Sequence, residues 1–220
     1  MEQAIPMEQH LRLEPGRYYH IFNRGINGTN IFLEERNYAY FLNLYAKHVE
    51  PVAETFAYCL MRNHFHLLAR IKTLVDSETL VNPETFEVSE TSKVCARSKV
   101  PDATQSFANC FNAYAKAINK TYARTGSLFE HRFHRLKVTS ERYCMRLVHY
   151  IHFNPQKHGF VADFREYPYS SYRAFFSDKP TKLQRSQVLD WFGGRAAFDA
   201  VHRTLSDEKE IWSLIADDVV

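Results

Sequence analysis

The chain has 220 residues, 45% of them hydrophobic and 24% charged, with a formal net charge of +3, a balance that excludes a wholly disordered protein. No apolar run approaches the roughly eighteen residues of a membrane-spanning helix, and the first residues, MEQAIPMEQHLRLEPG, lack the basic and apolar segments of a secretory signal. The four cysteines have no CxxC spacing, which argues against a zinc ribbon or a disulfide framework, so we expect a cytoplasmic protein without a membrane segment.

The first elements that the sequence predicts are a strand, a loop and a helix. Residues 17–24 are aromatic and β-prone and predict the strand. The loop GINGTN follows, where Gly25 and Gly28 are free to take positive φ. Apolar residues near helical spacing predict a helix over residues 32–48, which Pro51 closes.

A β-hairpin and an insertion come next. Residues 55–61 and 64–71 predict two short strands that are joined by a turn at Arg62-Asn63. Residues 73–104 are rich in Ser, Thr, Glu, Val and Lys with little periodicity, and we interpret them as a mobile insertion.

Helical periodicity returns over residues 105–123, and residues 127–138 predict a loop and a strand. Ser140 is a natural N-cap for a helix over residues 141–153, with an inward stripe of Cys144, Val148 and Ile151, and Asn154-Pro155 should end that helix.

The domain organisation follows from this order of elements. We expect one domain over residues 1–180 and a tail over residues 181–220 with one or two short helices, near 185–192 and 195–205. Strands and helices in this order, with a hairpin among the strands, predict an α+β fold whose helices pack on a mostly antiparallel sheet.

Positive charge is concentrated in one part of the chain. Residues 105–160 hold nine Lys and Arg against two acidic residues, and five of the eleven histidines. Such a block indicates a polyanion partner or a solvated helix face. Aromatic residues interleaved with the charge, as in LFEHRFHR (128–135), favour nucleic acid, because rings can stack on unpaired bases.

The sharpest local feature is His64-Phe65-His66. On a strand, His64 and His66 face the same way, while Phe65 and Leu67 face the core. Two imidazoles at that spacing can share a divalent cation. A pair of surface or core histidines gives the same pattern, so both interpretations stay open at this point.

Tyr150 and Asn154 lie four residues apart near the end of a predicted helix and therefore project from one face. A tyrosine hydroxyl, with an unperturbed pKa of about 10, becomes a useful nucleophile where a metal ion polarises an electrophile such as a phosphodiester. Asn154 could add a carbonyl oxygen ligand. The alternative for Tyr150 is a packed helix aromatic, one of thirteen tyrosines in the chain.

These motifs together resemble the single-tyrosine HUH transposases (named for His–hydrophobic–His), and within them the REP-associated tyrosine transposase branch of the transposase insertion-sequence 200-like type. The resemblance covers most of residues 17–175 in the expected order. It runs through YYHIFNRGINGTNIF (18–32), AYCLMRNHFHLLARI (57–71), FNAYAKAINKTYARTGSLFEHRFHR (111–135), YIHFNPQKHGFV (150–161) and YPYSSY (167–172).

The resemblance implies a ferredoxin-like HUH fold and a set of site residues. By it, His64 and His66 bind Mg²⁺ or Mn²⁺, Asn154 stands at the third ligand position, and Tyr150 is the nucleophile. The implied activity is that of a transposase, which cleaves single-stranded DNA with palindromic hairpins through a 5′-phosphotyrosine. By the same resemblance, we expect DNA contacts at Arg24, Arg132, Arg135 and Lys137.

Several alternatives stay open. A domesticated, catalytically inactive protein of the same fold would bind hairpin DNA only, and a metal hydrolase would use water as the nucleophile. A relaxase or replication initiator usually carries a further domain. Tyr143 shares a helix face with Tyr150 but lies two turns away, about 10.5 Å, and we place His149 and His152 at the surface or facing DNA. The sequence leaves open a monomer or a homodimer.

Overall fold

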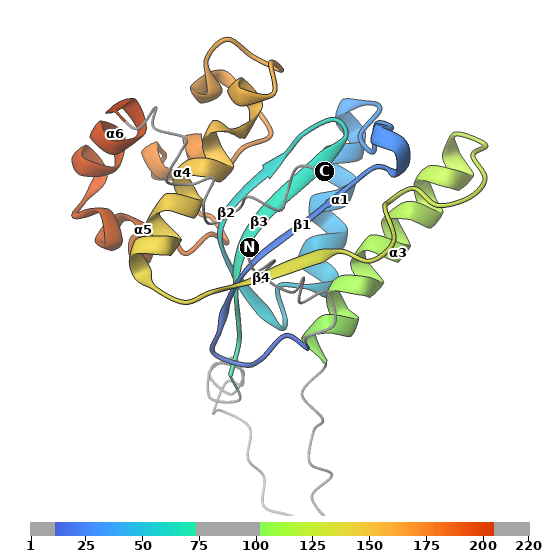
Figure 1. Ribbon diagram of the computed structural model, residues 1–220, viewed down its shortest axis with the longest axis horizontal. Coiled ribbons are helices and arrows are strands. Elements are labelled where there is room, and N and C mark those ends of the chain that lie inside the picture. Colours follow the sequence, from blue (N-terminus) through green and yellow to red (C-terminus); the bar gives the residue numbers. More distant parts are fainter. Residues whose placement is uncertain (1–11, 74–101, 205–220) are drawn as a thin grey trace, which may run out of the picture.

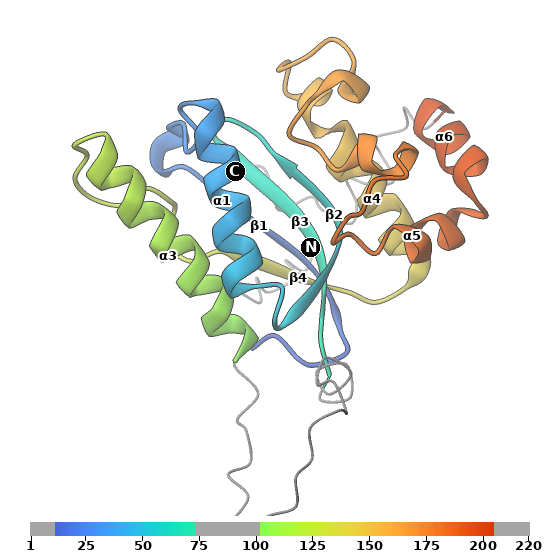
Figure 2. The ribbon, with the colours of Figure 1, turned by 180° about the vertical axis from the view of Figure 1, so that it is seen from behind.

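The computed structural model describes residues 12–73 and 102–204, which form a four-stranded sheet with helices on both faces (Figure 1 and Figure 2). The spatial order is β2-β3-β1-β4, and each neighbouring pair is antiparallel. This confirms the predicted α+β fold. The strands are β1 (Tyr18–Arg24), β2 (Ala53–Leu60), β3 (His64–Ile71) and β4 (His134–Val138).

One face of the sheet is covered by α1 (Glu35–His48) and α3 (Ala103–Thr121). Each helix begins at a side-chain cap. Asn37 Oδ1 accepts a hydrogen bond from the backbone N–H of Glu34 at 3.0 Å, and Asp102 accepts one from the N–H of Thr104 at 2.8 Å. Such caps satisfy the backbone donors that a helix start leaves free. Phe41, Phe65 and Phe111 fill the core on this side.

The other face carries α4 (Glu141–Lys157), α5 (Arg185–Phe192) and α6 (Arg195–Thr204). Ser140 caps α4 by accepting a hydrogen bond from the N–H of Tyr143 at 3.2 Å, as predicted. The predicted inward stripe of α4 is also confirmed, because its three side chains are buried in a second core. They are Cys144, Val148 and Ile151.

Helix α4 does not end at Asn154-Pro155, as the sequence predicted, but continues to Lys157. Pro155 lies in the last turn, where a proline removes a single intrahelical hydrogen bond. The N–H of His158 then donates to the carbonyl of Asn154 at 3.0 Å and closes the helix. The extra turn matters for the site, because it keeps Asn154 inside regular helix and carries Lys157 onto the same face as Tyr150.

The loop after β1 is fixed to the turn of the β2–β3 hairpin. The N–H of Gly25 donates to the carbonyl of Asn63 at 2.7 Å, and the N–H of Ile31 donates to the carbonyl of Arg62 at 2.7 Å. Gly28 has positive φ, as predicted, but Gly25 has a φ of −67°. Gly25 needs to be glycine for another reason, because a Cβ there would lie 1.9 Å from the carbonyl oxygen of Thr29.

Short 3-10 segments complete the fold at η1 (Ile26–Gly28), η2 (Phe164–Glu166) and η3 (Tyr172–Phe176). Of the predicted insertion over 73–104, residues 74–101 lie outside the described residues, and α3 already begins at Ala103. The two helices expected in the tail are confirmed as α5 and α6. Helix α5 packs on α4, and α6 packs on α5 and bonds α4 through His202. Among the described residues, no helix is long and apolar enough to cross a membrane.

Candidate active site

His64 and His66 lie at the start of β3, directly after the hairpin turn, and both face α4. Phe65 and Leu67 point to the opposite core, under α1 and α3. The two imidazole ring centroids are 5.3 Å apart. His66 is buried and His64 is half-buried. The strand alternation therefore places both histidines on one face, as the sequence predicted.

Tyr150 and Asn154 approach these histidines from α4. The Tyr150 ring stands edge-on to His66, with centroids 5.5 Å apart. Asn154 is fully buried, and its Nδ2 donates to the backbone carbonyl of Tyr150 at 3.2 Å. Its Oδ1 has no partner of ideal hydrogen-bond geometry among the described residues, but the Asn154 side chain lies close enough to His64 to raise the pKa of that histidine. A buried carbonyl oxygen without a partner is costly unless a ligand occupies it.

Burial keeps both histidines of β3 neutral. It lowers the pKa of His64 to about 3, aided by the charge of nearby His158 and opposed by the side chain of Asn154. Burial also lowers the pKa of His66 well below its usual value, and His20 acts in the same direction. A neutral imidazole is the form that coordinates a metal ion.

Both histidine rings of β3 form a hydrogen bond through Nδ1. His64 Nδ1 bonds Asn63 Oδ1 at 2.7 Å, and His66 Nδ1 bonds His20 Nε2 at 2.9 Å. Nε2 of His64 therefore has a lone pair for coordination, whereas Nε2 of His66 has one when Nδ1 of His66 is the donor. Among the described residues, no group of three or more His, Cys, Asp or Glu side chains is placed to hold a metal ion. The side-chain oxygen of Asn154, next to His64, is of a type that could serve as a third protein ligand.

The sequence did not single out three neighbours of this site: His20, Lys157 and His158. Lys157 Nζ lies 5.1 Å from the centroid of the Tyr150 ring. The His158 ring stands edge-on to His64, with centroids 4.8 Å apart. A spacing of seven residues from Tyr150 would have placed Lys157 on the same helix face. The sequence predicted that the helix ends at Asn154-Pro155, so Lys157 was not considered part of it.

The basic residues that the resemblance named as DNA contacts lie on β1, on β4 and in the loop before β4. Arg24 pairs in register with His64 and forms an ion pair with Glu130 at 2.6 Å. Lys137 lies near the other end of the sheet and forms an ion pair with Glu14 at 2.8 Å. Arg132 is exposed, and the Arg135 guanidinium lies 4.8 Å from the centroid of the Phe133 ring. Their contacts with DNA stay a prediction.

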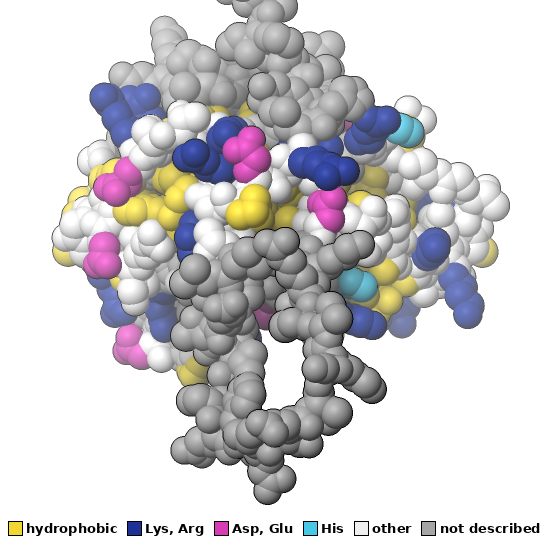
Figure 3. Space-filling model, turned by 90° about the horizontal axis from the view of Figure 1, so that it is seen from below, with side chains coloured by type: hydrophobic (Ala, Val, Ile, Leu, Met, Phe, Trp, Pro, Cys, Tyr) yellow, Lys and Arg dark blue, Asp and Glu magenta, His cyan; other side chains and the backbone are white. Residues whose placement is uncertain are grey.

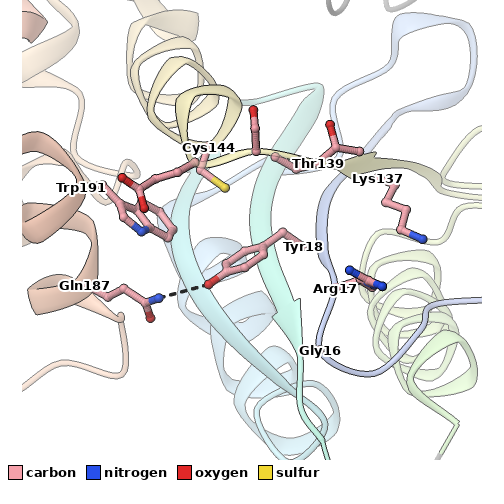
Figure 4. A pocket seen from close by; sticks show the side chains of 11 residues that line it. Gly16, Arg17, Tyr18, Lys137, Thr139, Cys144, Gln187 and Trp191 are labelled. Atoms are coloured by element: carbon pink, nitrogen blue, oxygen red, sulfur yellow. Dashed lines mark hydrogen bonds between the residues drawn. The ribbon is translucent and has the colours of Figure 1, made fainter.

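On the face shown in Figure 3, Lys and Arg side chains alternate with Asp and Glu rather than forming one continuous patch. A pocket of about 390 Å³ lies elsewhere, at the Tyr18 end of β1 (Figure 4). Gln187 Nε2 donates to the Tyr18 hydroxyl at its wall, at 3.1 Å. This pocket is separate from the histidines, because Tyr18 and the His64 partner Arg24 are at opposite ends of β1.

The prediction that His149 and His152 lie at the surface or face DNA is wrong. Their side chains are buried, with exposed fractions of 2% and 0%. Helix α6 and the segment around Ser171 cover their side of α4. His152 Nδ1 bonds His202 Nε2 at 3.0 Å, and His152 Nε2 bonds Ser171 Oγ at 2.8 Å. Both nitrogens of His149 lack a hydrogen-bond partner within the described residues. A helical wheel of α4 alone gave no sign of this cover, because it comes from the tail.

We expect this buried histidine group to make the fold sensitive to acid. Burial lowers the pKa of His149 to about 4, and burial with the charge of His149 lowers the pKa of His202 to about 3. The unfolded chain takes up these protons below about pH 6.5, so the stabilisation is complete above that pH and is lost as pH falls toward 4. Each such histidine should contribute a loss of about 2 kcal/mol between pH 7.5 and pH 5.

Urea unfolding at a series of pH values measures this effect. His149→Leu should flatten the dependence of the unfolding free energy on pH by about one histidine's share. An unchanged slope in that variant would show that His149 is not held neutral by the fold.

Comparisons with known proteins agree with this description at the level of the fold. The fold of this chain is similar to that of a solved structure of a tyrosine transposase. The particular structure is that of a REP-associated tyrosine transposase bound to a REP hairpin, with a TM-score of 0.55 over 82% of this chain and 89% of that chain. The two sequences are 14% identical, so the likeness concerns the fold. No family model and no curated protein sequence matches the chain.

Proposed function

We propose that this protein is a metal-dependent endonuclease and strand transferase for hairpin-containing single-stranded DNA, with Tyr150 as its nucleophile. The observation that carries the proposal is the position of the Tyr150 ring, edge-on to His66 and one helical turn from Asn154. The structural neighbour was solved with a REP hairpin, which supports hairpin DNA as the substrate class.

The proposed reaction is a transesterification. The Tyr150 hydroxyl oxygen attacks the scissile phosphorus, and the bond between phosphorus and the 3′-oxygen breaks. The phenolic proton leaves to solvent, and the departing 3′-oxygen takes up a proton to give a free 3′-OH. The products are a 5′-phosphotyrosine and that 3′ end. The covalent link preserves one phosphodiester, so the 3′-OH of a strand can attack it in turn and no nucleoside triphosphate is needed.

His64, His66 and Asn154 would hold Mg²⁺ or Mn²⁺ through two imidazole nitrogens and one amide oxygen. Such an ion, when bound, stabilises the charge that develops on a phosphoryl oxygen. Lys157 supplies a fixed positive charge beside the Tyr150 ring, and Arg24 lies next to His64 in the sheet. Both are placed to attract a phosphate to Tyr150, because a cation near the developing negative charge lowers the barrier.

Labelled single-stranded hairpin oligonucleotides, incubated with the protein and Mg²⁺ or Mn²⁺ and separated on a denaturing gel, test the proposal. We expect a band of reduced mobility that protease removes and EDTA prevents. Tight hairpin binding without such a band, with both metals and several hairpins, would favour the inactive binding protein. Cleavage without a covalent band would favour a water nucleophile.

A further inference from the structure

His20 lies on β1, next to the strand that carries His64 and His66, and none of the roles above uses it. Its ring is fully buried and stacks on His66, with centroids 5.1 Å apart and planes at 21°. His20 Nε2 and His66 Nδ1 are 2.9 Å apart, a hydrogen-bonding distance. The ring also stands edge-on to Tyr150, with centroids 6.1 Å apart. His20 is therefore in contact with both the ligand strand and the nucleophile helix.

The bond between these two imidazoles has two possible directions with different consequences. A neutral imidazole carries one proton, so one ring donates and the other accepts. If His20 Nε2–H donates, His66 keeps its proton on Nε2, which then has no lone pair for a metal ion. If His66 Nδ1–H donates, Nε2 of His66 carries the lone pair and can coordinate. Whether His20 accepts or donates thus decides whether Nε2 of His66 has a lone pair for the metal ion.

We propose that His20 is a positioning residue that accepts the Nδ1–H of His66 and so presents Nε2 of His66 to the divalent cation. His64 has a corresponding partner in the Oδ1 of Asn63, at 2.7 Å from its Nδ1, so both ligand rings are oriented by an acceptor at Nδ1. Partners of this kind fix the tautomer and the direction of a ligating histidine. The inference rests on the proposed metal site.

The proposed direction leaves the proton of His20 on Nδ1, which is buried and has no hydrogen-bond partner among the described residues. An unpartnered buried donor is unfavourable. Without metal, the opposite hydrogen bond, from His20 Nε2–H to His66 Nδ1, therefore competes. Coordination at Nε2 of His66 selects the proposed one. The pair therefore couples metal binding to the position of one proton, and removal of the acceptor should weaken metal binding rather than unfold the chain.

Mn²⁺ titration of the DNA-free full-length protein, followed by the electron paramagnetic resonance signal of the free ion, tests this role. His20→Phe keeps an aromatic ring and removes the acceptor, and we expect the dissociation constant for Mn²⁺ to rise by about 10–100-fold. His20→Gln can place an amide oxygen near the position of Nε2 and should recover most of the affinity. His64→Ala is the control that removes a ligand. Thermal unfolding of each variant shows whether it is folded.

Equal Mn²⁺ affinity in His20→Phe and the wild type would overturn the proposal, as would equal losses in folded His20→Phe and His20→Gln. Wild-type protein that binds no Mn²⁺ would overturn it together with the metal site. Binding without a covalent DNA adduct would refute the proposed reaction and leave the role of His20 intact. If both variants fail to fold, histidine-selective ¹⁵N NMR of the wild type with Mg²⁺ decides, since a proton on Nε2 of His66 would contradict the proposal.

Discussion

Tyr150→Phe should lower the yield of covalent protein–DNA adduct at least ~10³-fold, because the variant lacks the only atom of that side chain that can bond to phosphorus. The ring that packs against His66 remains. Hairpin affinity should change by less than about twofold, since removal of one hydroxyl leaves the phosphate contacts unchanged. A denaturing gel measures the adduct, and an electrophoretic mobility shift measures binding.

Tyr143→Phe is the matched control for this change. Tyr143 lies seven residues before Tyr150 on α4 and shares its face, but about 10.5 Å along the helix axis. This variant should form the adduct at the wild-type rate. Loss of the adduct in Tyr143→Phe with its retention in Tyr150→Phe would reverse the assignment. Cleavage at the wild-type rate by Tyr150→Phe without any covalent adduct would establish a water nucleophile.

His64→Ala should lower the cleavage rate by about 10²–10³-fold, which corresponds to loss of several kcal/mol of transition-state stabilisation by a bound cation. Hairpin affinity should stay within about threefold, because it comes mainly from neutralised phosphates. Removal of metal with EDTA should lower the wild-type rate at least as much and add little to the effect of His64→Ala. Single-turnover cleavage with saturating protein separates rate from affinity.

His48→Ala supplies the control for this second change, since His48 lies in the last turn of α1, on the face of the sheet opposite α4. It should leave the cleavage rate unchanged. If His64→Ala lost cleavage and hairpin affinity equally and also melted at a lower temperature, His64 would be a structural residue. If the rate of the wild type did not depend on Mg²⁺ or Mn²⁺, the two histidines of β3 would have another role.

Structural features that depend on a short local pattern could be predicted from the sequence. Strand alternation alone placed His64 and His66 on one face and Phe65 on the other, and the structure has β3 over the predicted residues. Ser140 capped the helix that the periodicity predicted. In each case, the physical cause acts within a few residues of chain, so neighbouring letters carry the information.

Features that depend on distant parts of the chain were missed. His20 contacts His66 only because β1 pairs with β3 in one register, and the two residues are 46 positions apart. His149 and His152 are buried because the tail folds back over α4. Gly25 has to be glycine because the carbonyl oxygen of Thr29 leaves no room for a Cβ, and not because of a positive φ. Such contacts arise from tertiary packing, which no local periodicity encodes.

The packing of α4 on the sheet of the same chain determines which polypeptide supplies each residue of the site. Helix α4 follows β4 after two residues, Thr139 and Ser140, and lies against β2 and β3 of the same chain. Tyr150, Asn154, His64 and His66 therefore come from a single polypeptide. We therefore expect a mixture of two defective chains, one lacking Tyr150 and the other lacking His64, to form no covalent DNA adduct.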